Sequence, residues 1–142
     1  MIILAVDYGD ARTGLAVCDK TEMLARPAGV IHQWNMDKTA EAVVQAAKEN
    51  NAQRIIVGNP LNMNGSAGDR SQLCHDFADK LRALCPHIPV QMWDERSTTV
   101  SAINYLNMTD TRGKKRKAVV DAVAATIILE NYMAYRKNHP EE

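Results

Sequence analysis

Short apolar runs alternate with helical stripes of apolar residues along this chain. The first run, residues 2–6, is rich in β-branched side chains and predicts a strand that is buried on both faces. It ends at Asp7, and a turn that contains Gly9 leads to a second apolar run, residues 15–17. The two runs are close enough to form an antiparallel hairpin. Such a hairpin would hold Asp7 at the end of a core strand.

The next segments follow the order of an α/β protein. Residues 23–31 contain Pro27 and predict an edge strand, because proline cannot donate a backbone hydrogen bond. Residues 36–50 carry apolar side chains at helical spacing, and a short buried strand is predicted at 53–58. A helix followed by such a strand is typical of a parallel βαβ crossover.

The second half of the chain predicts three further helices and one strand. The predicted elements are a helix at about 69–85, a strand at 88–93, a helix at 97–107 and a helix at about 117–137. The first of these helices has a candidate core stripe of large side chains: Leu73, Phe77, Leu81 and Leu84. Residues 108–117, between the last two helices, are polar and basic and predict a mobile loop.

The loop at 59–69 is dense in turn residues and lies between a predicted strand and a predicted helix. Open α/β sheets bind ligands at such positions, and the backbone N–H groups at a helix start can receive a phosphate. Ser66 with Asp69 also resembles a capping box, which needs no ligand. The sequence leaves both interpretations open.

Composition narrows the class of protein. A chain of 142 residues with 46% hydrophobic and 24% charged residues predicts a single globular domain over 1–142. No apolar run approaches the roughly 20 residues of a membrane span, so we expect a soluble protein without membrane partners. Three cysteines without a CxxC pair predict reduced thiols and a cytoplasmic location.

Positive charge is concentrated although the totals balance. Lys+Arg and Asp+Glu both number 17, so the whole chain predicts no attraction to a polyanion. Residues 112–117, however, are basic at every position except Gly113. This run is either a solvated surface or a binding site for a nucleic-acid backbone.

Three acids each interrupt or end an apolar segment, where a position in a surface loop would have been easier. Asp7 ends the first strand, Glu95 ends the last strand, and Asp121 lies in the apolar start of the last helix. Neighbours in a strand face opposite sides, so at most one of Asp94 and Glu95 points where Asp7 does. An unpaired carboxylate at the position of Asp121 would cost several kcal/mol, so we expect a cation beside it.

Converging carboxylates repel one another unless divalent cations neutralise them. Their hard oxygen ligands favour Mg²⁺ or Mn²⁺, as one or two ions. A pair of such ions can activate water and stabilise the leaving oxygen of a phosphodiester. The pattern is therefore compatible with metal-dependent hydrolysis of a phosphodiester bond.

Motifs spread over nearly the whole chain resemble those of the YqgF family, also called RuvX. The matching residues are Asp7-Tyr8-Gly9, Arg12 and Gly14; Val57-Gly58, Pro60-Leu61-Asn62-Met63 and Gly65-Ser66; Asp94-Glu95-Arg96-Ser97-Thr98-Thr99; and Lys117, Asp121, Ala124, Ala125 and Ile127-Ile128-Leu129. The resemblance implies an RNase H-like fold of the α/β class, with a mixed five-stranded sheet and helices on both faces. It also implies an acidic site at Asp7, Glu95 and Asp121, and activity as a pre-16S rRNA nuclease or a Holliday junction resolvase. Ala124 stands where the related RuvC resolvases carry a further aspartate, so a second metal ion would be held more weakly.

In the predicted mechanism, Asp7 bridges the metal ions, and Glu95 and Asp121 complete their coordination. The predicted nucleic-acid-binding residues are Arg12, Asn62, Lys114, Lys115, Arg116 and Lys117. Arg12 has an alternative role as a salt-bridge partner within the hairpin. The favoured substrate is the 5′ end of pre-16S rRNA in ribosome biogenesis, ahead of a Holliday junction.

Other classes of function are compatible with the same residues. A non-catalytic RNA-binding assembly factor would keep the fold without cleavage. A phosphotransferase related to the sugar kinases would need a second domain to enclose ATP. The sequence leaves the choice between monomer and homodimer open, although symmetric cutting of a junction would call for a dimer.

Overall fold

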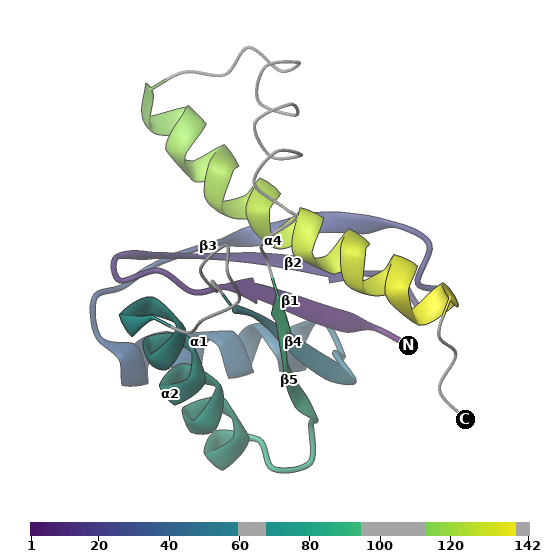
Figure 1. Ribbon diagram of the computed structural model, residues 1–142, viewed down its shortest axis with the longest axis horizontal. Coiled ribbons are helices and arrows are strands. Elements are labelled where there is room, and N and C mark those ends of the chain that lie inside the picture. The colour runs from purple at the N-terminus through teal and green to yellow at the C-terminus, as the bar shows by residue number, and fades with distance from the viewer. Residues whose placement is uncertain (60–67, 95–112, 139–142) are drawn as a thin grey trace.

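The structure is a computed structural model of the whole chain (Figure 1). It describes residues 1–59, 68–94 and 113–138, with the backbone alone for residues 113–122. The helix predicted at 97–107 and most of the predicted loop at 59–69 lie outside these ranges.

A mixed five-stranded sheet forms the centre of the molecule, in the order β3-β2-β1-β4-β5. The predicted hairpin is confirmed, since β1 (Ile3–Asp7) pairs antiparallel with β2 (Arg12–Cys18). Beyond it, β3 (Ala25–His32) pairs antiparallel with β2. On the other side, β4 (Arg54–Asn59) is parallel to β1, and β5 (Val90–Asp94) is parallel to β4. The predicted sheet is therefore confirmed.

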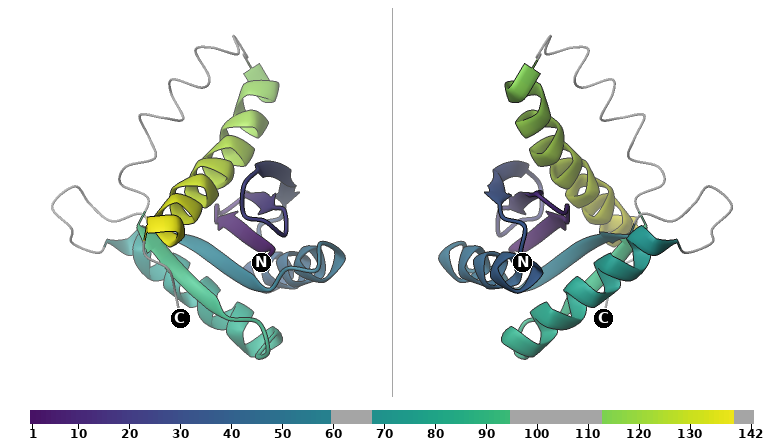
Figure 2. Two further views of the ribbon diagram at one scale, coloured as in Figure 1. Left: turned by 90° about the vertical axis from the view of Figure 1, so that its right-hand side faces the viewer. Right: turned by 90° about the vertical axis from the view of Figure 1, so that its left-hand side faces the viewer.

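Helices cover both faces of the sheet, as predicted (Figures 1 and 2). α1 (Met36–Glu49) and α2 (Asp69–Leu84) pack on one face, and α4 (Gly113–Asn138) packs on the other. Side chains of β1 alternate between the two cores: Leu4 contributes to the α1/α2 side and Ile3 to the α4 side. This two-sided burial explains why β1 is apolar at every position before Asp7.

The predicted core stripe of α2 is partly wrong. Phe77 is fully buried, but Leu73 is 37% exposed and Leu84 is 46% exposed. The buried stripe consists of Ser71, Cys74, Phe77, Ala78 and Leu81. Small side chains at three of these positions let the helix approach closely, so the longer leucines lie at the margin of the contact.

The start of α2 differs from the capping box of Ser66 with Asp69 that the sequence suggested. Gly68 is the N-cap residue and makes no side-chain cap bond. Asp69 is therefore the first helical residue and does not hold the third position that a capping box requires. The capping box is excluded, and the loop before α2 lies outside the described residues.

The start of α4 is a second correction. The helix begins at Gly113, four residues before the predicted start, so the basic run 114–117 lies in its first turns instead of in a loop. Lysine and arginine have high helix propensity, which explains why a run that looks like a polar loop is helical. The apolar part of the helix follows, and Ala125, Ile128 and Leu129 are fully buried.

Polar side chains connect α4 to the parallel strands and cover one sheet edge. Arg54 donates to the hydroxyl of Tyr132 at 2.6 Å, and that hydroxyl donates to Gln91 at 3.0 Å. At the outer edge of β5, Arg82 donates to the carbonyl oxygen of Val90 at 2.9 and 3.3 Å.

Trp93 is partly buried and packs against the core on the α4 side of the sheet. Its ring makes edge contacts with Tyr132 and Tyr135, with centroids 5.2 Å apart in both cases. The three cysteines, Cys18, Cys74 and Cys85, are free and buried, in agreement with the predicted reduced thiols. Within the described ranges, no helix combines the length and the hydropathy needed to cross a membrane.

Candidate active site

The carboxyl ends of three parallel strands meet at one edge of the sheet. β1 ends at Asp7, β4 at Asn59 and β5 at Asp94, and Asn59 is directly opposite Asp94 in the strand register. Glu95 is the next residue in the chain. Open α/β sheets position functional side chains at this edge, so the topology brings the first and last strand-end acids of the sequence to one region.

A tight turn fixes the backbone after Asp7. The hydroxyl of Thr13 lies 3.3 Å from both the amide nitrogen and the carbonyl oxygen of Gly9, and Thr13 is fully buried. A Cβ atom on Gly9 would lie 2.1 Å from the carbonyl oxygen of Arg12. Only glycine therefore fits this turn, which returns the chain into β2 opposite Asp7.

Arg70, in the first turn of α2, contacts the turn between β1 and β2. Its guanidinium donates to the carbonyl oxygen of Tyr8 and, at 2.8 Å, to Asp10. It also lies 5.3 Å from the centroid of the Tyr8 ring, which stacks on Phe77 with centroids 4.4 Å apart. Three types of contact thus connect α2 to Tyr8 and Asp10, in the turn that follows Asp7.

The sequence analysis missed Arg70. A positive charge in the first turn of a helix is disfavoured by the helix dipole, so an arginine there indicates a nearby acidic partner. That signal is present in the sequence, but it does not identify Asp10, 60 residues away, as the partner.

The pKa values of Tyr8 and Arg70 determine the charge of each side chain in this turn. Burial, followed by the negative charge of Asp10, raises the pKa of Tyr8 above its ordinary value of 10.0. Burial would lower the pKa of Arg70, but the hydrogen bond and charge of Asp10 help to raise it. Tyr8 therefore remains a neutral phenol, and Arg70 a cation, at physiological pH.

A second bond connects α2 to the end of β4. The buried hydroxyl of Ser71 donates to the side-chain oxygen of Asn59 at 2.6 Å. Adjacent residues of α2, Arg70 and Ser71, thus hold the ends of β1 and β4. The strand ends where the acids lie are therefore held by bonds from α2 as well as by strand pairing.

The start of α4 contributes the remaining predicted residues. Asp121 lies one helical turn before Ala125 and two turns before Ile128, and both of those residues pack against the sheet. The basic residues of 114–117 lie within the first turns of the same helix. The positive end of the helix dipole coincides with this cluster of basic residues.

Comparison with known proteins agrees with this geometry. A family model described as "RuvX: Holliday junction resolvase" matches residues 1–135. The chain belongs to the RuvX family. The resemblance found in its motifs is thereby confirmed.

RuvX relatives match along nearly their full length. A protein of Halothermothrix orenii is 41% identical over 136 residues, which cover 96% of each chain. A protein of Caldanaerobacter subterraneus is 37% identical over 139 residues, which cover 97% of this chain and 99% of the relative. Both carry the name "Putative pre-16S rRNA nuclease".

Solved structures show the same RNase H-like fold as this RuvX chain. RuvC of Thermus thermophilus aligns with a TM-score of 0.59 at 12% identity, over 97% of each chain. The fowlpox virus Holliday junction resolvase aligns with a TM-score of 0.56 at 15% identity, over 95% of this chain and 99% of the viral one. The predicted fold class is therefore confirmed.

The predicted RuvX site residues are described to different extents. Asp7 is partly buried at the end of β1, and Arg12 is the partly buried first residue of β2, opposite His32. Glu95 and Asn62 lie outside the described ranges, as do the side chains of Asp121, Lys114, Lys115, Arg116 and Lys117. Among the side chains described, no group of three His, Cys, Asp or Glu could hold a metal ion. The acidic triad thus stays a prediction that the topology supports.

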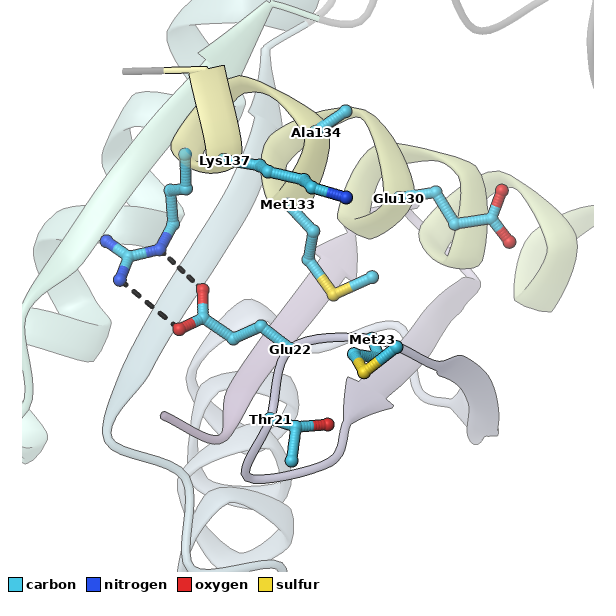
Figure 3. A pocket seen from close by; sticks show the side chains of 8 residues that line it. Thr21, Glu22, Met23, Glu130, Met133, Ala134 and Lys137 are labelled. Carbon is cyan, nitrogen blue, oxygen red and sulfur yellow. Dashed lines mark hydrogen bonds and ion pairs between the residues drawn. The ribbon is translucent and has the colours of Figure 1, made fainter. Parts of the chain in front are cut away.

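A pocket of about 690 Å³ lies elsewhere, between the β2–β3 turn and the last turns of α4 (Figure 3). One of its two acids, Glu22, accepts hydrogen bonds from Arg136 at 2.6 and 3.4 Å and from the N-terminal ammonium at 3.1 Å. These bonds, that from Arg136 foremost, lower the pKa of Glu22 below its ordinary value of 4.5. Glu22 is therefore a structural acid that joins α4, the turn and the chain start.

Proposed function

We propose that this RuvX-family chain is a metal-dependent nuclease that hydrolyses phosphodiester bonds in structured nucleic acid. The observation that supports the proposal is the convergence of strand ends, which brings Asp7 and the residue before Glu95 to one edge of the sheet. Asp121 on α4 is the third acid of the proposed site. These three carboxylates are the catalytic residues that we propose.

The set of donors fits a hard divalent cation, since all three are carboxylates. Asp7, Glu95 and Asp121 would hold one or two Mg²⁺ or Mn²⁺ ions. When bound, such ions lower the pKa of water and neutralise negative charge on the phosphate. Asp7 has the most rigid support, because Gly9 and Arg70 fix the backbone beside it.

Basic residues would bind the phosphate backbone next to these acids. Four basic residues in the first turns of α4 add to the positive end of its dipole. Arg12 begins the strand beside Asp7 and would contact a phosphate from the other side. We propose that Asn62 belongs to the same binding surface, as the family resemblance implies.

The substrate we propose is precursor 16S rRNA, cut at its 5′ end during ribosome biogenesis in the cytoplasm. The names of the full-length relatives support this choice. A Holliday junction is the alternative substrate, supported by the description of the family model. Cutting a junction symmetrically would need two active sites and hence a homodimer.

The test is cleavage of labelled precursor 16S rRNA and of a four-way DNA junction in Mg²⁺, Mn²⁺ or EDTA. Wild-type protein should cut one of them only with a divalent metal, and Asp7→Asn should not cut. Asp76→Asn is the control, because it removes an exposed acid of α2 far from the strand ends. Cleavage by Asp7→Asn at the wild-type rate would disprove the site assignment.

A second candidate function is a non-catalytic RNA-binding factor, which the basic start of α4 favours. It predicts binding without cleavage, weakened in the triple variant Lys114→Ala, Lys115→Ala, Arg116→Ala. Each lost phosphate contact should reduce the slope of log affinity against log salt by about 1. Binding should be unaffected by Asp7→Asn in this case, and no metal should produce cut products.

A further inference from the structure

Trp34 is the most exposed of the large apolar side chains in the described residues, at 79%. It lies between β3 and α1, directly before the N-cap residue Asn35. The other tryptophan, Trp93, is packed against two tyrosines. An exposed indole presents a large flat apolar face on which another ring can stack.

A structural role for the Trp34 ring is not evident. An apolar residue before an N-cap commonly packs on the fourth helical residue, as a hydrophobic staple. Here that residue is Thr39, whose hydroxyl donates to the carbonyl oxygen of Asn35 at 2.9 Å and which is only 1% exposed. Within the described ranges, no aromatic ring packs on Trp34 either. The exposed ring thus neither staples α1 nor joins an aromatic cluster.

The backbone beneath the ring is nevertheless held firmly. The side-chain oxygen of Gln33 accepts hydrogen bonds from the amides of Trp34 and Asn35, at 3.0 and 3.1 Å. The amide of Gln33 donates to the carbonyl oxygen of Ala11 at 3.0 Å. Asn35 in turn caps α1 by accepting from the amide of Lys38 at 3.0 Å. An exposed side chain on a fixed backbone is preorganised for a ligand.

Trp34 lies at the same end of the sheet as the proposed active site. His32, two residues earlier, is opposite Arg12 in the strand register, and Gln33 contacts the β1–β2 turn at Ala11. Figure 1 shows the chain passing from β3 into α1 at the end where this turn lies. Two strand spacings, about 10 Å, separate β3 from β1. A few nucleotides of single strand would span from Asp7 to Trp34.

We propose that Trp34 is a stacking platform for a base in a single-stranded segment that flanks the bond cut at the acidic site. The inference rests on the proposed function and adds a substrate feature to it. Bases in a duplex are already stacked on one another, whereas an unpaired base has a free face for an indole. Arg12 begins β2, the strand between β3 and β1, and its positive charge suits the intervening phosphates.

The test measures binding in EDTA, so that affinity is separated from cleavage. The probes are a labelled single-stranded oligoadenylate and a blunt hairpin of the same length. Trp34→Ala should weaken binding of the single strand about tenfold and leave hairpin binding unchanged. Leu24→Ala is the matched control, because Leu24 is 72% exposed at the opposite end of the sheet.

Intrinsic fluorescence supplies an independent signal, since the chain has 2 tryptophans. Stacking of a base on Trp34 should quench the wild-type emission. Trp34→Phe should keep most of the affinity but lose the quenching, because Trp93 alone remains and is packed in the protein.

The outcomes separate this inference from the proposed function. Equal single-strand affinity of wild type and Trp34→Ala, or no binding by wild type, would overturn the stacking platform even if metal-dependent cleavage is observed. Conversely, binding that depends on Trp34 in a protein that cuts neither substrate would support the platform and contradict the nuclease.

Discussion

The two ends of the sheet both carry acids, but these acids are placed differently. At the β2–β3 end, Glu22 is bound by Arg136 and by the N-terminal ammonium. At the other end, Asp7 and Asp94 end parallel strands, and Arg70 is engaged by Asp10 and the Tyr8 carbonyl. An acid with its own arginine stabilises the fold, whereas acids gathered from several strand ends are suited to a cation from solution.

The largest expected effect comes from neutralising one acid at each end. Asp7→Asn should reduce cleavage at least about 100-fold, because a proposed metal ligand is lost. Its melting temperature should stay within a few degrees of wild type or rise, since carboxylate repulsion is relieved. Glu22→Gln should keep full cleavage with a lower melting temperature. The reverse pattern, measured by gel assay and calorimetry, would invalidate the comparison.

Substitutions of Gly9, in the turn after Asp7, and of Gly29, within β3, should differ next. Gly9→Ala places a Cβ atom 2.1 Å from the Arg12 carbonyl oxygen, so the turn beside Asp7 must shift. We expect a loss of about 2–4 kcal/mol in unfolding free energy, measured in urea, together with reduced cleavage.

Gly29 is the control for that experiment. It has a φ of +116° in β3, but no atom lies within 4 Å of an added Cβ. Gly29→Ala should therefore cost about 1 kcal/mol through backbone strain alone and leave cleavage intact. Equal losses of activity in the two variants would contradict a special role for the first turn.

Replacing the arginine at each end should separate positioning from stability. Arg70→Met removes the bonds to Tyr8 and Asp10, and we expect kcat to fall about tenfold with KM nearly unchanged. Arg136→Met should lower the unfolding free energy by about 1–2 kcal/mol and leave kcat alone. Recovery of kcat in Arg70→Lys would show that charge suffices, whereas no recovery would indicate that the planar guanidinium is required.

The smallest effect is a pH dependence of stability. The folded-state pKa of Glu22 is depressed, so its contribution to stability is present above about pH 4.5 and is lost as the pH falls through the lower, folded value. Glu22→Gln should therefore flatten the acid limb of the stability curve below about pH 4.5. An unchanged acid limb in thermal melts would show that Glu22 is not the titrating group.

The sheet could be predicted because its strands carry strong and simple patterns. Residues 2–6 and 55–57 are apolar at every position, and Pro27 marks an edge strand. The strands and their order along the chain could therefore be predicted. Which face of α2 is buried could not be predicted. Leu73 and Cys74 both have partners at helical spacing, and only the space available against the sheet decides that Cys74 is buried.

The candidate site was predictable to the extent that it depends on strand ends. Asp7 could be found because a carboxylate interrupts an apolar run. Arg70 could not, since its role arises from contact with residues about 60 positions away. The start of α4 was misplaced because helix propensity outweighed the polar character of the basic run.

The sheet has two outer strands, and neither offers an easy template for a further strand. Pro27 in β3 has no N–H group to donate. The register of the pairing between β3 and β2 also shifts, at the step from Leu15 to Ala16 of β2. On the opposite side, Arg82 occupies the outward carbonyl of Val90 in β5. Joining two copies into one continuous sheet would require breaking these features. If the protein does pair with itself, its helices and turns are the surfaces that would form the contact, and its strand edges are protected against aggregation.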